Sequence, residues 1–530
     1  MPRYSRLALL TSLILVSAAC DKDVVAADSG PDGTASIESY DKIRDDLAIA
    51  STVEENLRQL SDIHGPRLTG TPRYLEMVEW VVFRIRGWGI DDIAIEVYGD
   101  GDRGWEVESF SAALTSPVFS ELGAQPICCG ASTDGEVNGT PLVVDFYDLE
   151  ALRRLDGKLR GKILLHPDVT DLGQPETGRW SEERLQTAAN RIEAITPDGL
   201  DGPGSTVSFV ERLRERQADE DGSDVELAEY LIEQGVAAVL RSSNAPAGVV
   251  NNRFNSGPIE FHGIGDPKPV PFFVLPREQH ERLLGLIENG SKPTLSMSLV
   301  SNFYEAPEYH VNVIAEIPGS DPKLSHEVVM LGAHLDSVET ATGAADNGIG
   351  AATSMEVLRL IKSLDLKPRR TIRVALWGGE EQGLKGSLAY MKHHIGDIMT
   401  GEYGDEHERI SAYFNHDNNG HDIRGIFTVG HKKIKTIFEP IFASFDEVGA
   451  GTVTIENAGG TDILVFDASG IPSFEWIHDP GMYFTHQLHT DLDVSAMVNF
   501  ESANRNAAIV ATVVYETAML DAMLPRKEVE

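Results

Sequence analysis

The hydrophobic pattern changes character twice along the chain. Apolar residues recur at helical spacing between residues 37 and 87, which predicts helices in an N-terminal domain segment over 37–121. Between residues 122 and 300 the pattern becomes a series of short apolar runs, each typical of one β-strand. A polar helical stretch at about 170–225 interrupts these runs. We therefore expect a β-rich domain over 122–300 that carries a polar helical insertion.

Strands and helices alternate in the last part of the chain. The pattern predicts strands at 310–317, 327–332 and 371–377, and helices at 347–364 and 494–520. Helices of this length between strands indicate an α/β domain over 301–524, in which helices flank a mixed, mostly parallel sheet. Ligands of such sheets bind at the carboxyl ends of the strands.

Side chains that bind metals or transfer protons occur after these strands and in a loop near the C-terminus. The set comprises His334, Asp336, Asp346, Glu380, Glu381, Asp417 and His489. Two imidazoles and several carboxylates without thiolates suit a hard or borderline divalent metal. Two metal ions that share one carboxylate need about this number of ligands, and one further carboxylate must move protons. The adjacent Glu380 and Glu381 provide one residue for each of these two tasks.

The ordered set resembles that of the co-catalytic zinc aminopeptidase family, and within it the carboxypeptidase Q (plasma glutamate carboxypeptidase) group. Four segments carry the resemblance further: Gly-Pro-Arg-Leu-Thr-Gly at 65–70, Leu-Trp-Gly-Gly-Glu-Glu-Gln-Gly at 376–383, Gly-Gly-Thr-Asp at 459–462 and Met-Leu-Pro-Arg at 523–526. The stretch 122–300 resembles a protease-associated domain inserted into the peptidase domain. The resemblance implies a zinc-exopeptidase fold for 37–121 together with 301–524.

The resemblance also implies two Zn²⁺ ions per chain and a set of protein ligands for them. His334 and Asp417 would bind one ion, Glu381 and His489 would bind the other, and Asp346 would bridge both.

Two further carboxylates have implied catalytic roles. Glu380 would be the general base, and Asp336 would form a hydrogen bond with the second ring nitrogen of His334 and so fix its tautomer. The peptide bond between Asp346 and Asn347 is expected to be cis, as in the family.

The second histidine ligand has an alternative. The family's C-terminal motif places an aspartate four residues after the histidine, and His489 has this spacing to Asp493, whereas His486 lies three residues earlier. We therefore choose His489 as the ligand. His486, Asp462 and Tyr483 are expected to contact the substrate or to support the ligands.

The first residues have the pattern of a bacterial lipoprotein signal. Two arginines precede an apolar run at 7–16, and small residues precede Cys20. The run is too short to cross a bilayer. We expect a signal peptide at 1–19, acylation of Cys20, a flexible tether at 20–36, and a location in the cell envelope facing the periplasm or the exterior. The alternative is an ordinary secretory signal with an incidental cysteine.

Cysteine and charge content exclude several other classes. The remaining cysteines, Cys128 and Cys129, are adjacent, so we expect neither a disulfide framework nor a thiolate zinc site. The chain has 83 acidic and 45 basic side chains and a net charge of −38. Such a chain repels phosphate backbones, so we expect no nucleic-acid partner. No other segment is apolar enough to cross a membrane, so we expect no membrane contact beyond the lipid.

The resemblance implies a homodimeric exopeptidase of aminopeptidase or dipeptidase type. Its substrates would be dipeptides or short peptides with a free N-terminus. Two alternatives stay open on the same fold: a non-catalytic, receptor-like binding protein, and a single-zinc acyltransferase of the glutaminyl cyclase type. The complete set of predicted ligands argues against the first, and the inserted domain and the Gly-Gly-Glu-Glu segment argue against the second.

Overall fold

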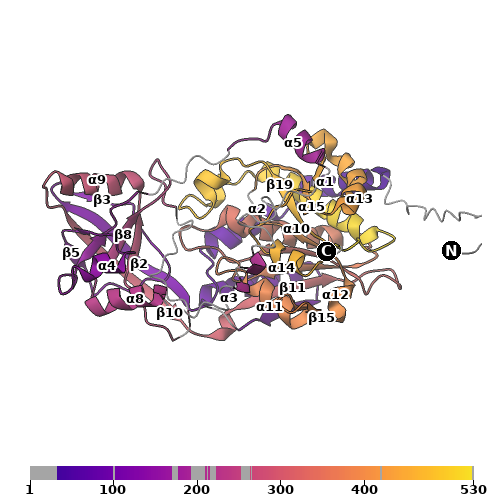
Figure 1. The fold of residues 1–530 in the computed structure, drawn as a ribbon. Helices are drawn as coiled ribbons and strands as arrows, with labels where there is room; N and C mark the ends of the chain where they lie inside the picture. The colour runs from indigo at the N-terminus through magenta and orange to yellow at the C-terminus, as the bar shows by residue number, and fades with distance from the viewer. Residues whose placement is uncertain are drawn as a thin grey trace, which may run out of the picture.

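The computed structural model describes most of the chain, and it forms two lobes (Figure 1). The described residues are 33–99, 102–169, 177–191, 209–211, 213–214, 223–251, 263, 265–417 and 420–527. The predicted signal peptide and Cys20 lie outside them. Among the described residues, no helix combines the length and the hydropathy needed to span a membrane.

The larger lobe is built on an eight-stranded mixed sheet. In spatial order its strands are β1 (Ile93–Val97), β11 (Val311–Ile317), β13 (Thr371–Trp377), β12 (Val328–His334), β16 (Ile410–Asn415), β19 (Ser473–His478), β17 (Ile423–Phe427) and β18 (Thr452–Thr454). The central strand β12 is parallel to β13 and to β16, and β16 is parallel to β19. These central strands are buried along their whole length, as expected for parallel strands covered on both faces.

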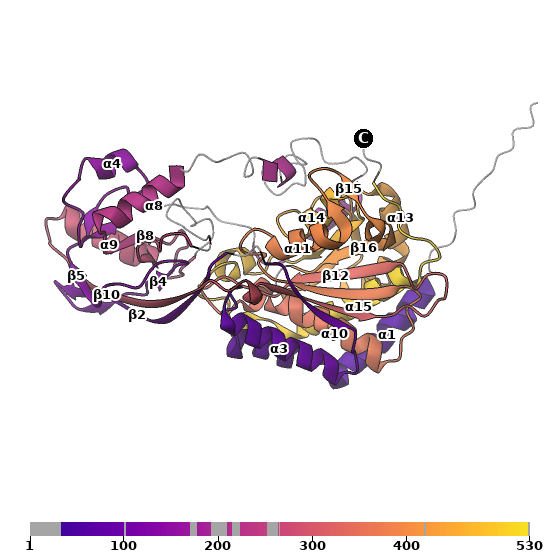
Figure 2. The same cartoon turned by 90° about the horizontal axis from the view of Figure 1, so that it is seen from below.

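Helices cover both faces of this sheet. One face carries α1 (Gly33–Ala50), α2 (Val53–Arg58), α3 (Pro72–Gly87), α10 (Ile349–Ser363), α13 (Lys432–Phe442) and α15 (Phe500–Met519), and the other carries α11 (Lys385–Tyr390), η4 (Met391–Ile395) and α14 (Ile463–Ala468). Figure 2 shows α3 and α10 on one side of β12, and α11 and α14 on the other. Side chains of β12 alternate between the two cores, because Val329 and Leu331 face one and Val328 and Met330 face the other. The predicted α/β fold class is confirmed.

The last helix begins later than the sequence pattern predicts. The prediction starts it at residue 494, whereas α15 starts at Phe500. Residues Ser495–Met497 form a short 3₁₀ turn, and the Asn499 side chain accepts hydrogen bonds from the N–H groups of Glu501 and Ser502. This N-cap satisfies amides that the first helical turn leaves unpaired, and so it fixes the start of the helix.

Within the described residues, the smaller lobe contains two sheets and three helices. A four-stranded sheet has the order β3 (Ser120–Glu121), β2 (Gly104–Ser116), β10 (Thr294–Tyr304) and β5 (Val137–Gly139), and a five-stranded sheet has the order β4 (Gln125–Pro126), β9 (Phe272–Leu275), β8 (Ala238–Ser242), β7 (Ile163–Leu165) and β6 (Leu142–Val143). The helices are α4 (Leu149–Arg153), α8 (Ser223–Gln234) and α9 (Arg277–Glu288). The long strands β2 and β10 pair along their length and connect this lobe to the larger one (Figure 1).

Cys128 and Cys129 form a disulfide in this lobe, joined across a cis peptide bond. Our expectation that the adjacent cysteines would not pair is wrong. Their Cα atoms lie 2.9 Å apart, the separation that a cis peptide gives.

The polar insertion packs against the larger lobe. Its helix α5 (Glu182–Ala189) contacts β18, and the Thr454 hydroxyl donates to the Ala188 carbonyl at 2.8 Å. Arg424, which is fully buried, forms an ion pair with Glu182 at 2.6 Å. Figure 1 shows α5 beside α13 of the larger lobe. The insertion therefore connects the lobes a second time.

Arg67 joins the N-terminal helices to the loop that follows β12. Its buried guanidinium donates to the carbonyls of Leu335 (2.8 Å), Thr342 (2.7 Å) and Gly343 (2.8 Å). The planar five-donor fork of arginine suits several carbonyls at fixed positions. The Gly-Pro-Arg-Leu-Thr-Gly segment thereby holds the loop that begins just after His334.

Replacement of Arg67 by lysine should destabilise the fold. Lysine keeps the positive charge but cannot satisfy the same carbonyls, and each lost hydrogen bond to a charged group contributes about 1.5–3 kcal/mol. We expect Arg67→Lys to lower the free energy of unfolding by about 3 kcal/mol, measured by urea denaturation followed by tryptophan fluorescence. Arg86→Lys, at an exposed position on α3, is the matched control. Equal midpoints for the two variants would contradict this role of Arg67.

Candidate metal centre

The predicted site residues meet at one edge of the eight-stranded sheet. His334 is the last residue of β12, Glu380 and Glu381 follow β13, and Asp417 follows β16. Because these strands are parallel neighbours, their carboxyl ends lie side by side. Asp346 comes from the short helix η3 (Ala344–Gly348) at the start of α10.

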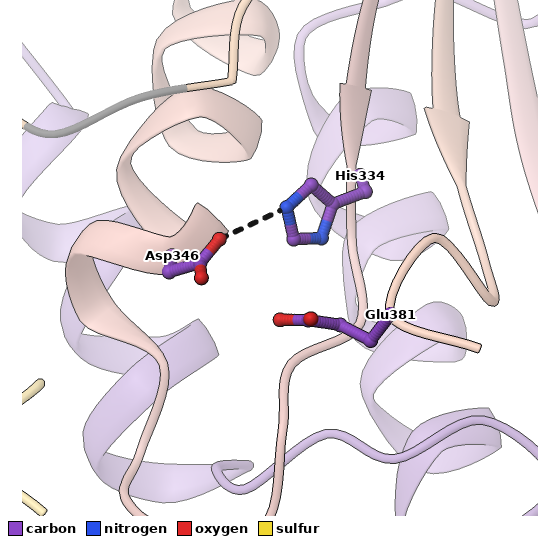
Figure 3. A group of neighbouring side chains, drawn as sticks. All are labelled: His334, Asp346 and Glu381. Carbon is purple, nitrogen blue, oxygen red and sulfur yellow. Dashed lines mark hydrogen bonds and ion pairs between the residues drawn. The ribbon is translucent and has the colours of Figure 1, made fainter. Parts of the chain in front are cut away.

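Asp346 lies between two imidazoles. Its Oδ1 atom is 3.2 Å from His334 Nε2, and its Oδ2 atom is 3.2 Å from His489 Nε2. Each imidazole faces a second carboxylate as well: His334 Nε2 lies 3.3 Å from Asp417 Oδ1, and His489 Nε2 lies 2.9 Å from Glu381 Oε2. Figure 3 shows His334, Asp346 and Glu381 pointing toward one common space.

These residues fit a bound divalent metal. One ligand atom from each of His334, Asp346 and Glu381 lies within 4.8 Å of the other two. Asp346 Oδ2 and Glu381 Oε1 are buried, yet neither accepts a hydrogen bond. Buried carboxylate oxygens without a donor are costly unless a cation takes the donor's place. The donor types, imidazole nitrogen and carboxylate oxygen, are those that zinc binds.

The charges in this space are mutually dependent. Burial opposes a charge on His334 and on His489, but the nearby carboxylates outweigh it and raise the pKa of both imidazoles well above the ordinary value. Burial also opposes the charge on Asp346, but the two neighbouring imidazoles lower its pKa. In Glu381 burial dominates and raises the pKa. The site thus stabilises positive charge between its carboxylates, which a metal ion would supply.

Asp336 acts through its main chain as well as its carboxylate. His334 Nδ1 forms its hydrogen bond with the Asp336 carbonyl at 3.1 Å, whereas the Asp336 carboxylate lies 3.6 Å from that nitrogen. The carboxylate instead accepts hydrogen bonds from the N–H groups of Glu380 (3.3 Å) and Glu381 (3.2 Å). The Asp336 carboxylate is thus an ion-pair partner of His334, and the predicted hydrogen bond between its side chain and the imidazole stays a prediction. The Asp336 carboxylate thereby holds the main chain of the loop that follows β13.

Comparison with known proteins agrees with this geometry. Residues 312–514 match the model of Peptidase family M28. Carboxypeptidase Q of Mus musculus is 26% identical over 475 residues, which cover 89% of this chain and 87% of that protein. The crystal structure of a peptidase M28 precursor from Shewanella amazonensis has a TM-score of 0.65 at 20% identity and covers 94% of this chain and all of that one. A zinc aminopeptidase from Bacillus subtilis has a TM-score of 0.51 at 17% identity and covers 89% of this chain and 98% of that one.

Residues 312–514 thus match peptidase family M28, and most of the chain is similar to carboxypeptidase Q. The predicted family resemblance is confirmed, and the chain is a zinc metallo-exopeptidase. The structural likenesses, at 20% identity or less, bear on the fold alone.

Asp493 supports the centre in a way that the sequence analysis missed. Its buried carboxylate accepts hydrogen bonds from the N–H groups of Ala345 (2.6 Å) and Asp346 (3.0 Å). Burial raises the pKa of Asp493 to about 7. The signal was present in the sequence, because we used the spacing between His489 and Asp493 to choose the histidine but assigned the aspartate no contact.

Asn347 ties the start of α10 to the strand that ends near Asp417. Its side-chain amide donates to the His416 carbonyl at 2.7 Å, and its Oδ1 atom accepts from the Gly350 N–H at 3.1 Å. The predicted cis peptide bond between Asp346 and Asn347 is confirmed.

The three residues predicted to contact substrate or to support ligands have different surroundings. Asp462 is buried and accepts a hydrogen bond from the Ser387 hydroxyl, and burial raises its pKa to about 7. Tyr483 is buried, and after burial itself the charges of Asp346 and Asp417 contribute most to raising its pKa. His486 is partly buried, and its Nδ1 atom lies 2.8 Å from Thr485 Oγ1.

The geometry yields a test of the two histidines. We expect His489→Ala to weaken zinc binding by more than about 100-fold, because loss of a mere hydrogen-bonding partner of a ligand already costs 10- to 100-fold. His486→Ala should retain zinc and activity. Zinc content by elemental analysis and hydrolysis of a peptide substrate measure both effects. Full zinc and activity in His489→Ala, with loss of both in His486→Ala, would overturn the assignment.

Proposed function

We propose that this chain is a di-zinc exopeptidase that hydrolyses dipeptides or short peptides with a free N-terminus. The position of Asp346, which offers one carboxylate oxygen to each of two imidazoles, carries the proposal. One zinc ion would be held by His334 and Asp417, and the other by Glu381 and His489. Asp346 would bridge them. Such pairs of metal ions, joined by a carboxylate, hold both reacting oxygens of a hydrolysis.

Glu380 is the proposed general base. Zinc bound at the centre would supply Lewis acidity, which lowers the pKa of water and stabilises negative charge on the carbonyl oxygen of the substrate. Glu380 would accept the proton of the attacking water and return it to the leaving amine. Burial, and after it the charges of Asp417 and Glu381, raise the pKa of Glu380 well above the ordinary value.

Asp336 and Asp493 would hold the reacting groups in place. Asp336 binds the main chain at Glu380 and Glu381, and so fixes the base relative to its neighbouring ligand. Asp493 binds the main chain at Asp346. Because the base is already oriented toward the water, little orientational entropy is lost in reaching the transition state.

We also propose that the free N-terminus of the substrate is recognised through its charge. The ammonium group would be held by acidic residues around the metal ions. We further propose that residues 122–300 form a protease-associated domain.

Peptide hydrolysis tests the proposal directly. We expect release of amino acids from dipeptides but not from the matched N-acetylated dipeptides, with loss of activity on chelation and recovery with zinc. The Glu380→Gln variant should keep its zinc and lose about 100- to 10,000-fold in kcat, because that is the contribution of a positioned base.

Glu402→Gln, at an exposed position on β15 (Glu402–Tyr403), is the control for this substitution. Cleavage of acetylated dipeptides at the same rate would reject recognition of the amine. Undiminished activity of Glu380→Gln would reject the base, and zinc-independent hydrolysis would reject the metal mechanism.

We also propose that Cys20 is acylated, so that the enzyme is held by lipid at the cell envelope and faces the periplasm. The apolar run at 7–16 and the small residues before Cys20 support this. In a bacterial host, labelled palmitate should enter the parent protein and be absent from Cys20→Ser, which should leave the membrane fraction. Labelling or membrane retention of Cys20→Ser equal to that of the parent would contradict acylation at this residue.

A further inference from the structure

His489 is held on a loop, whereas His334 is held on a central strand. The loop follows β19 and passes through the short helix η6 (Tyr483–Gln487) before it reaches His489. His489 has a φ of 56°, a left-handed backbone conformation that residues with a side chain rarely adopt. Its side chain is 25% exposed, and that of His334 is fully buried. The loop needs contacts from elsewhere to keep this imidazole in place.

Two residues between β8 and β9 of the inserted segment supply such contacts. The Asp491 N–H donates to the Val250 carbonyl, and the Val250 N–H donates to Asp491 Oδ1, both at 2.9 Å. Asn251 and Thr490 form an antiparallel β-bridge. The Asn251 side-chain amide donates to the Leu488 carbonyl at 3.3 Å. These partners flank the predicted metal-binding histidine on both sides.

Asn251 is itself fixed within the inserted segment. It is 3% exposed, and its N–H donates to Ser243 Oγ at 3.0 Å. The same hydroxyl donates to the Val249 carbonyl at 2.7 Å. Ser243 directly follows strand β8, so the smaller lobe's sheet fixes the position of Asn251.

A second contact holds the beginning of the same loop. Gly178 and Gly481 exchange two main-chain hydrogen bonds of 2.8 Å. The Trp180 indole donates to the His478 carbonyl at 2.7 Å, and its N–H donates to Asp479 Oδ1 at 2.9 Å. This segment precedes α5, which packs on the larger lobe. The inserted segment therefore contacts the loop at both ends.

We infer that Asn251 is a positioning residue for His489, and that the inserted segment thereby sets the metal affinity of one half of the centre. The inference rests on the proposed di-zinc function. The half formed by His334 and Asp417 stands at the ends of adjacent strands and needs no such support. Loss of the Asn251 contact should therefore affect the two halves unequally, which general destabilisation would not do.

Metal titration of Asn251→Ala tests the inference. Parent and variant are stripped of metal and equilibrated with buffers of graded free Zn²⁺, and bound zinc per chain is measured by elemental analysis. We expect one ion to bind as in the parent and the other about 10- to 100-fold more weakly, the effect that loss of a ligand's supporting partner has. In the metal-free protein, amides 488–491 should exchange hydrogen faster in the variant than in the parent.

Two further variants keep the test decisive. Trp180→Phe retains an aromatic ring but loses the donor to His478, and should weaken the same ion even if Asn251→Ala does not fold. Asn289→Ala removes an exposed amide that donates only within the C-terminal turn of α9, and should bind both ions as the parent does.

The outcomes separate this inference from the proposed function. Two ions of parental affinity in both Asn251→Ala and Trp180→Phe, or an equal loss of both ions, would overturn the inference and leave the di-zinc function standing. A parent protein that binds fewer than two ions would overturn the di-zinc function, and the inference with it.

Discussion

The repulsion between carboxylates buried at one edge of the sheet is the constraint on which the centre depends. Two unit charges about 4 Å apart repel by about 4 kcal/mol at an effective dielectric constant of about 20. Asp346, Glu381 and Asp417 gather around two imidazoles that have raised pKa values, and two of their buried oxygens accept no hydrogen bond. A fold can keep such a group together only by holding the main chain rigidly and by admitting cations. The structure meets the first requirement, and the similarity of residues 312–514 to peptidase family M28 agrees with the second.

Main-chain hydrogen bonds provide this rigidity. Asp336 binds the two amides at Glu380 and Glu381, and Asp493 binds the two amides at Ala345 and Asp346. Arg67 fixes the carbonyls of the intervening loop. Each of these side chains is buried and charged, so each would be costly if its partners moved. The ligands are therefore positioned by buried side chains that bind the backbone next to them.

Sequence reasoning found the parts of the protein that depend on local pattern. Strands β11, β12 and β13 and helix α10 follow from the spacing of apolar residues, and the metal-binding residue types stand where those strands end. Contacts between distant segments leave no such pattern. The Asp336 carboxylate accepts hydrogen bonds from amides that lie 44 and 45 residues further along the sequence. The Asn251 side chain donates a hydrogen bond to a carbonyl that lies 237 residues further along. The apolar periodicity predicts a start of α15 at residue 494, which is too early, because the N-cap at Asn499 determines where the helix begins.

The two halves of the centre are consequently held by different means. His334 and Asp417 follow adjacent parallel strands, and the hydrogen bonds of the sheet set the distance between them. His489 has no strand to fix it, and its loop is bound on both sides by segments that lie between β7 and β9 in the chain. One predicted ligand is thus held by the core and another by contacts between the lobes. Because of this, the site is complete only when the two lobes are in contact. The insertion is therefore best understood as part of the scaffold of the centre, although none of the predicted ligands belongs to it.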